Sequence, residues 1–190
     1  DFKYYLFQEF GIDSHRYEHE WEYEQYLRLS EPGFAALQAL LGESDAPCHV
    51  LAHEFMGMGL VLKVLLVADA RFKTLFYAHE VATVRPLVEE GAGRDLSFYN
   101  TLRQGRQEGA YIEAYYGAQD GYFKHALVRQ AWRCDAVLAV GDLVVEELRF
   151  LGAEFAERDI DLVYNGVPAT LLSAGEKQQA GQRMKDLCAG

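Results

Sequence analysis

Side chains able to bind a polar ligand follow an apolar stretch in the segment KTLFYAHEVATVR, residues 73–85. The apolar residues among 74–78 predict a buried strand. His79, Glu80 and Arg85 come after it within seven positions. An imidazole can exchange hydrogen bonds with hydroxyl groups, and a guanidinium is a fixed, planar cation. The segment therefore predicts a polar site at the exit of a buried strand.

A second histidine and glutamate pair, His53 and Glu54, ends the preceding predicted strand, Cys48–Ala52. The two pairs would line one crevice, because the carboxyl ends of parallel strands meet at one edge of a sheet. The sequence HEFMG carries Gly57 where the zinc motif HExxH requires its second histidine, and neither pair has a third ligand at helical spacing, so we predict no metal site. One alternative stays open, namely that these polar residues only cap the helices that follow.

Composition restricts the class of protein. The 190 residues are half hydrophobic, enough for one sizeable core, and the net charge is −11, which disfavours nucleic acid and anionic membranes as partners. Cys48, Cys134 and Cys188 are far apart and form no CxxC pair, which argues against a disulfide framework and for a reducing compartment. With no signal peptide or membrane span recognised, the expected location is the cytoplasm.

Strand-like and helix-like segments alternate from residue 48 onward. Strands are expected at 48–52, 73–80, 135–141 and 160–168, and helices at 55–70, 121–134 and 142–152, the last ending at Gly152. This alternation predicts an α/β fold with a Rossmann-like parallel sheet covered by helices on both faces, and His53, His79, Gly141 and Asn165 fall at its strand ends. The glycines of GMG, residues 57–59, lie within a helix, where Gly57 lets the helix approach a ligand or the sheet closely.

The residues before this region are aromatic and less regular. Asp1–Ile12 resembles a strand or an extended arm, and residues 14–44 resemble a pair of helices, the second beginning at Ser30–Pro32 and closed by Gly42. HRYEHEWEYEQY, residues 15–26, is interpreted as a solvated helix with a weak aromatic stripe, an edge strand being the alternative. The chain looks like a piece of a longer protein. We expect a partial domain at 1–168 and the start of a linker helix at 169–190.

Five motifs in order resemble the N-terminal half of a glycogen synthase, closest to the eukaryotic and archaeal type. They are AHEFMGMGL, TLFYAHEVATVR, SFYNTL, ALVRQAWRCDAVLAVGDLVVEEL and LVYNGV, and the resemblance covers about Pro47–Pro168. Each motif alone is weakly specific, and the five together are typical of retaining glycosyltransferases. The resemblance implies one domain of a two-domain GT-B enzyme, here the acceptor-side domain. Such an enzyme transfers glucose from UDP-glucose or ADP-glucose to an α-1,4-glucan without a further cofactor.

Residue roles follow from the resemblance position by position. His79 and Glu54 match residues near the reacting sugar and are the expected catalytic residues. Arg85 and Asn165 match donor-binding positions, and His53 and Asn100 fall on the acceptor side. The expected partners are the glucan, the nucleotide sugar and a C-terminal domain of the same protein, while the oligomeric state stays open.

Several positions depart from the family pattern and put the sugar specificity in doubt. Phe55 replaces a Trp, Ala78 a Thr, Glu80 a small or amide residue, Val84 a Gly and Gly141 a Ser. The proposed roles agree with the chemistry, because cleavage of a sugar–diphosphate bond builds negative charge on the leaving group and needs fixed donors there. Two alternatives remain: another retaining transferase of the sucrose, trehalose or mannosyl type, and a sugar-binding domain without catalysis.

Overall fold

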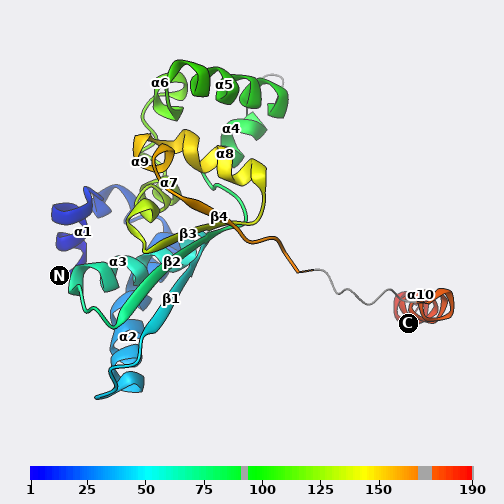
Figure 1. The fold of residues 1–190 in the computed structure, drawn as a ribbon, viewed down its shortest axis with the longest axis horizontal. Coiled ribbons are helices and arrows are strands. Elements are labelled where there is room, and N and C mark those ends of the chain that lie inside the picture. The colour runs from blue at the N-terminus through cyan, green and yellow to red at the C-terminus, as the bar shows by residue number, and fades with distance from the viewer. Residues whose placement is uncertain (91–93, 167–172, 190) are drawn as a thin grey trace.

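The computed structural model describes residues 1–90, 94–166 and 173–189, and its centre is a parallel sheet of four strands (Figure 1). The strands are β1 (Cys48–His53), β2 (Phe72–Ala78), β3 (Ala136–Ala139) and β4 (Ile160–Leu162). All four lie where apolar runs predict them, and the α/β class with a parallel sheet is confirmed. The last strand is shorter than expected, and residues 167 and 168 of the predicted run lie outside the described residues.

The strands follow one another across the sheet in chain order, β1-β2-β3-β4. Right-handed crossovers that always step in one direction place the connecting helices on the same face. The burial pattern agrees, since Ala52 and Phe76 are buried whereas Leu51 is 53% exposed and Tyr77 is half-buried. The expectation of helices on both faces is therefore wrong for the described part of the chain. Apolar strands alone do not reveal the strand order that decides which face the helices cover.

Helical segments connect each strand to the next. They are η2 (Glu54–Gly57) and α3 (Met58–Val67) between β1 and β2; α4 (Val84–Glu90), α5 (Arg94–Glu108), α6 (Ile112–Tyr116), α7 (Phe123–Val128) and η3 (Ala131–Arg133) between β2 and β3; and α8 (Asp142–Leu151) and α9 (Ala153–Ala156) between β3 and β4. The single helix expected at 121–134 is thus wrong, because the chain turns at residues 129–130 and continues as a short 3-10 helix. The helix α8 ends at Leu151 with Gly152 as its C-cap, which confirms the predicted end at this glycine.

The N-terminal segment is a helix, α1 (Phe2–Phe10), and not the expected strand or arm. The side chain of Asp1 accepts a hydrogen bond from the backbone N–H of Lys3, and Gly11 ends the helix with φ 67°. An N-cap aspartate favours the start of a helix, and a glycine in the left-handed conformation favours its end. The buried residues Phe2 and Leu6 are one helical turn apart, so the apolar spacing also fits a helix.

A single long helix, α2 (Trp21–Leu41), replaces the expected helix pair, and Pro32 lies inside it. A proline in a helix interior removes one backbone hydrogen bond and costs about 3 kcal/mol. The helix nevertheless continues, because its buried face runs unbroken past the proline through Leu27, Ser30 and Phe34. Gly42 ends the helix, as predicted.

The segment at residues 15–26 is mostly exposed, as expected of a solvated helix, but two of its rings and one carboxylate belong to the core. Tyr17, on the 3-10 helix η1 (Ser14–Tyr17), and Tyr23 are buried and pack edge to face with ring centroids 5.0 Å apart. Glu24 is also buried and pairs with Lys3 and Arg28. A single helical period over residues 15–26 does not place both rings, because residues 18–20 are not helical and separate Tyr17 on η1 from Tyr23 on α2.

Gly57 lies where α3 begins, directly against strand β1. A Cβ atom on Gly57 would lie 2.6 Å from the Cα of Ala52, a distance that real Cβ atoms do not adopt. The prediction that this glycine permits a close approach is confirmed for the sheet. The close packing fixes the helix and the strand end that carries His53 relative to one another.

The last described element is α10 (Ala174–Ala189), which confirms a helix in the tail and lies apart from the sheet in Figure 1. Its described side chains, at 174–183, are exposed except for a half-buried Ala180. The expected domain boundary at 168/169 lies outside the described residues. Within the described ranges, no helix has the length and apolar character needed to cross a membrane.

Candidate functional site

Two histidines and a tyrosine form an aromatic cluster at the carboxyl ends of β1 and β2. His53 is the last residue of β1 and pairs in register with Tyr77, and His79 follows the end of β2. Ring centroids are 4.5 Å apart for His53 and His79 and 4.5 Å apart for Tyr77 and His79. The parallel sheet thus brings together the two histidines that lie 26 positions apart in the chain.

Glu54 begins the 3-10 helix η2 with a backbone φ of 55°. This left-handed conformation is uncommon for residues other than glycine and costs about 1–2 kcal/mol. The side chain is half-buried at the same sheet edge as His79, as the parallel topology predicts. Strained backbone of this kind is concentrated at functional sites, so the conformation agrees with a role for Glu54.

A hollow of about 240 Å³ lies beside His79, between the segment after β2 and the helices α4, α5 and α8. Its polar lining is contributed by His79, Glu80, Arg85, Tyr99 and Glu147. Val81, Val84, Val88 and Val144 supply the apolar remainder. His79 and Arg85 therefore face one hollow, whereas His53, Glu54, Asn100 and Asn165 are not among its lining residues.

Arg85 is already paired within the molecule. Its Nη2 lies 2.5 Å from Oε2 of Glu80, and its Nη1 lies 3.8 Å from Oε1 of Glu89. The hydrogen bond and the charge of Glu80 raise the pKa of the guanidinium above its ordinary value, so Arg85 is a cation throughout the physiological range. Both Glu80 and Arg85 are substantially exposed, with side chains 41% and 61% accessible.

A buried carboxyl group forms the floor of the hollow and was not predicted from the sequence. Glu147 is 6% exposed, and its Oε1 accepts a hydrogen bond of 2.6 Å from the hydroxyl of Tyr99. Burial, together with the charge of nearby Glu80, raises the pKa of Glu147 above its ordinary value. The sequence does contain a signal for this burial. Glu147 lies three positions after Val144, so helical periodicity places it on the apolar face of α8.

The segment that carries His79 and Glu80 into the hollow is held by a buried histidine. Residues 81–84 are all buried, and the Oγ1 of Thr83 is 2.9 Å from Nδ1 of His125 on α7. His125 has no exposed surface, and burial, with a smaller contribution from Arg129, lowers its pKa from 6.5 to about 4. A neutral imidazole therefore anchors this segment at physiological pH.

The two asparagines predicted as site residues lie at the periphery. Asn100 is exposed on α5, and its Oδ1 accepts a hydrogen bond from Arg103 at 2.9 Å. Asn165 is exposed beyond β4. The hydroxyl of Tyr77 donates to the carbonyl of Val163 at 2.6 Å, so the segment leading to Asn165 passes the aromatic cluster.

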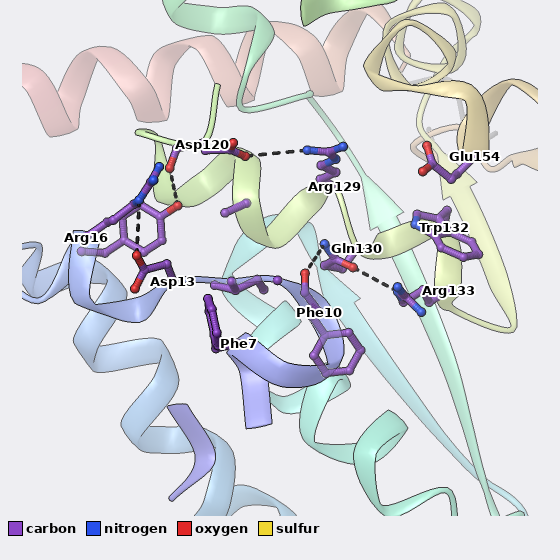
Figure 2. Close-up of a pocket in the computed structure, with 14 residues that line it drawn as sticks. Phe7, Phe10, Asp13, Arg16, Asp120, Arg129, Gln130, Trp132, Arg133 and Glu154 are labelled. Carbon is purple, nitrogen blue, oxygen red and sulfur yellow. Dashed lines mark hydrogen bonds and ion pairs between the residues drawn. The ribbon is translucent and has the colours of Figure 1, made fainter. Parts of the chain in front are cut away.

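A larger hollow, of about 470 Å³, lies between α1, η1, α7 and η3 and contains none of the predicted site residues (Figure 2). Arg16 pairs with Asp13, and Arg129 pairs with Asp120. Arg133 donates from Nε to Gln130, as Figure 2 shows. We place the candidate site at the smaller hollow, because its titratable groups gather at the carboxyl end of β2, where ligands usually bind in parallel sheets.

Among the described residues, no three His, Cys, Asp or Glu side chains gather as a metal-binding group. Cys134 is buried, which raises the pKa of its thiol to about 12, so it is a poor nucleophile. Comparison of the chain with protein-family models, with curated proteins and with solved structures finds no match.

Proposed function

We propose that this chain forms the acceptor-side domain of a retaining glycosyltransferase that transfers glucose from UDP-glucose or ADP-glucose to an α-1,4-glucan. The observation that carries the proposal is the position of His79, which belongs to the aromatic cluster and shares one hollow with Arg85. A group that can bind a sugar hydroxyl and a group that can bind phosphate thus lie at the same sheet edge. Carboxyl ends of parallel strands are the usual place for ligands in such sheets.

The two side chains have separate tasks in the proposed reaction. Breaking the bond between the sugar and the diphosphate places negative charge on the leaving oxygen, and Arg85 offers a planar pair of N–H donors for it. His79 holds a sugar hydroxyl and thereby fixes the ring relative to the phosphate. A single well-aimed donor is worth about 3 kcal/mol of barrier in such sites. Glu54 and His53 lie at the carboxyl end of the neighbouring strand β1, outside the residues that line the hollow, and under this proposal they face the acceptor.

The test is glucose transfer to glycogen by a protein that carries this chain together with the second domain implied by the resemblance. Arg85→Ala should weaken donor binding and slow transfer, because its contact exists before and during bond cleavage. His79→Ala should mainly lower kcat, because its hydrogen bond tightens as the sugar ring flattens. Donor affinity is measured separately by calorimetry. Absence of transfer from either donor by the wild-type protein would refute the glucan-synthase function, and an undiminished kcat in His79→Ala would refute the role of the imidazole.

A second candidate function is sugar binding without catalysis, and the ion pair between Glu80 and Arg85 favours it. A guanidinium that is already neutralised is less available to a donor phosphate. Under this alternative the chain binds maltooligosaccharides through the aromatic cluster, with no donor binding that depends on Arg85. Calorimetry with maltoheptaose and with UDP-glucose distinguishes the two functions.

A further inference from the structure

Carboxylates surround Arg85, the cation of the candidate site. Glu80 lies at 2.5 Å and Glu89 at 3.8 Å from its guanidinium nitrogens. The charge of Glu147 also acts on Arg85 from the floor of the hollow. With Glu80 and Glu147 ionised, the lining carries two negative charges and one positive charge. An anion that approaches this arrangement meets net repulsion.

These carboxylates differ in their freedom to move. Glu147 is buried and hydrogen-bonded to Tyr99, so its carboxyl group stays in place. Glu80 has an exposed side chain and lies on the turn directly after His79. An exposed ion pair contributes only about 0–1 kcal/mol, because water solvates both groups well when they separate. Glu80 can therefore leave Arg85 at small cost, and rotation of its side chain suffices.

We propose that Glu80 is an internal competitor for the anion that binds Arg85, and that it thereby sets the affinity and selectivity of the hollow. This inference rests on the proposed function, in which Arg85 receives the diphosphate of a nucleotide sugar. Glu80 occupies the guanidinium in the free protein, and the diphosphate replaces its carboxylate on binding. A diphosphate presents more charge and more acceptor oxygens than a carboxylate or a single phosphate, so it displaces Glu80 more readily.

The competition predicts a measurable change in affinity. When only a fraction of the molecules is competent to bind, the apparent Kd rises by the reciprocal of that fraction. Removal of the competing charge should therefore tighten anion binding by about threefold to tenfold at low salt. The gain has two sources: the ion pair no longer has to be broken, and the carboxylate no longer repels the anion. Salt should reduce the gain, because it screens exposed charges.

The experiment is a calorimetric titration of the whole 190-residue chain with inorganic pyrophosphate at low ionic strength, repeated with orthophosphate. Glu80→Gln keeps the size of the side chain and removes its charge, and it should bind pyrophosphate about threefold to tenfold more tightly than the wild type. The matched control is Glu89→Gln, which removes the same charge at the longer distance of 3.8 Å and should change the affinity by less than about twofold. Arg85→Ala and the double variant Glu80→Gln/Arg85→Ala should both bind weakly.

Each outcome decides a separate question. Equal affinities for Glu80→Gln and the wild type, with binding lost in Arg85→Ala, would overturn the competitor role and retain Arg85 as an anion site. Equal gains in Glu80→Gln and Glu89→Gln would reveal a general charge effect and also overturn it. Absence of binding by a folded Glu80→Gln, with folding checked by urea denaturation, overturns the inference. The proposed transferase function is decided independently by the glucose-transfer assay.

Discussion

Acid should destabilise this protein through one buried imidazole, that of His125. The ring has no exposed surface, and among the described residues its Nε2 has no hydrogen-bond partner. The nearest carboxylate oxygen belongs to Glu113, 4.0 Å from Nε2, and Arg129 opposes a positive charge on the ring. The Nδ1 atom is 2.9 Å from Thr83 Oγ1. Protonation would therefore place a poorly compensated charge in the core, under the segment that carries His79.

The size of the effect follows from the two pKa values. In the unfolded chain His125 titrates near its ordinary pKa of 6.5, and in the folded protein burial lowers the pKa to about 4. Above pH 6.5 neither state is protonated at His125, and the group has no effect on stability. As the pH falls below 6.5, only the unfolded state takes up the proton, so the free energy of unfolding decreases. At 1.36 kcal/mol per pKa unit, the loss reaches about 3 kcal/mol near pH 4.

Urea denaturation between about pH 7 and about pH 4 measures this loss. His125→Gln retains hydrogen-bonding capacity toward Thr83 but cannot take up a proton, so its stability should fall about 3 kcal/mol less than that of the wild type over this range. His19→Gln, on an exposed side chain, controls for the removal of a histidine. Thr83→Val keeps the imidazole buried and should retain the wild-type pH dependence. Parallel losses of stability in the wild type and His125→Gln would refute the reasoning.

Two further changes test the packing and the floor of the hollow. Gly57→Ala should destabilise the protein by about 1–3 kcal/mol in thermal or urea unfolding, because the new Cβ would lie 2.6 Å from the Cα of Ala52. The control is Gly121→Ala, since nothing lies within 4 Å of a Cβ at that position. Equal stability of the two variants would contradict the expectation. Glu147→Gln should become more stable relative to the wild type as the pH rises above 4.5, because burial raises the pKa of Glu147 and its ionisation opposes folding. A difference in the free energy of unfolding between the two proteins that does not vary with pH would contradict this.

Sequence reasoning predicted the strands well, because each is a short apolar run bounded by turns or glycines. It also predicted the meeting of His53 and His79, since the carboxyl ends of adjacent parallel strands share an edge. The face covered by helices was predicted wrongly. That property depends on the order of the strands in space, which the local pattern does not contain.

The N-terminal third was predicted less well, for identifiable reasons. Tyr4 and Tyr5 gave α1 a strand-like composition, although the caps at Asp1 and Gly11 indicate a helix. Pro32 suggested a break in α2, whereas the buried face on both sides of it is continuous. In α1 the caps were the better local signal, and in α2 the packing of a continuous buried face outweighs the local preference of Pro32.

Glu147 and His125 were not predicted as parts of the site for a different reason. Their burial arises from packing between segments far apart in the chain: Glu147 on α8 meets Tyr99 on α5, and His125 on α7 meets Thr83. Single-sequence patterns show which face of a helix is apolar, but they do not show which helix will cover it. The polar groups at the end of a strand were accessible to prediction, and those beneath them were not.

The order of the strands also bears on how the sheet forms and opens. Each strand after β1 pairs with the one that precedes it in the chain, so β2, β3 and β4 each meet an edge that has already been synthesised. β2 has a neighbour on both sides, whereas β4 is three residues long and pairs only with β3 among the described strands. Backbone amides of β2 should then be among the slowest to exchange with solvent, and those of β4 among the fastest. The sheet can grow from its N-terminal strand, and it loses β4 first when it opens.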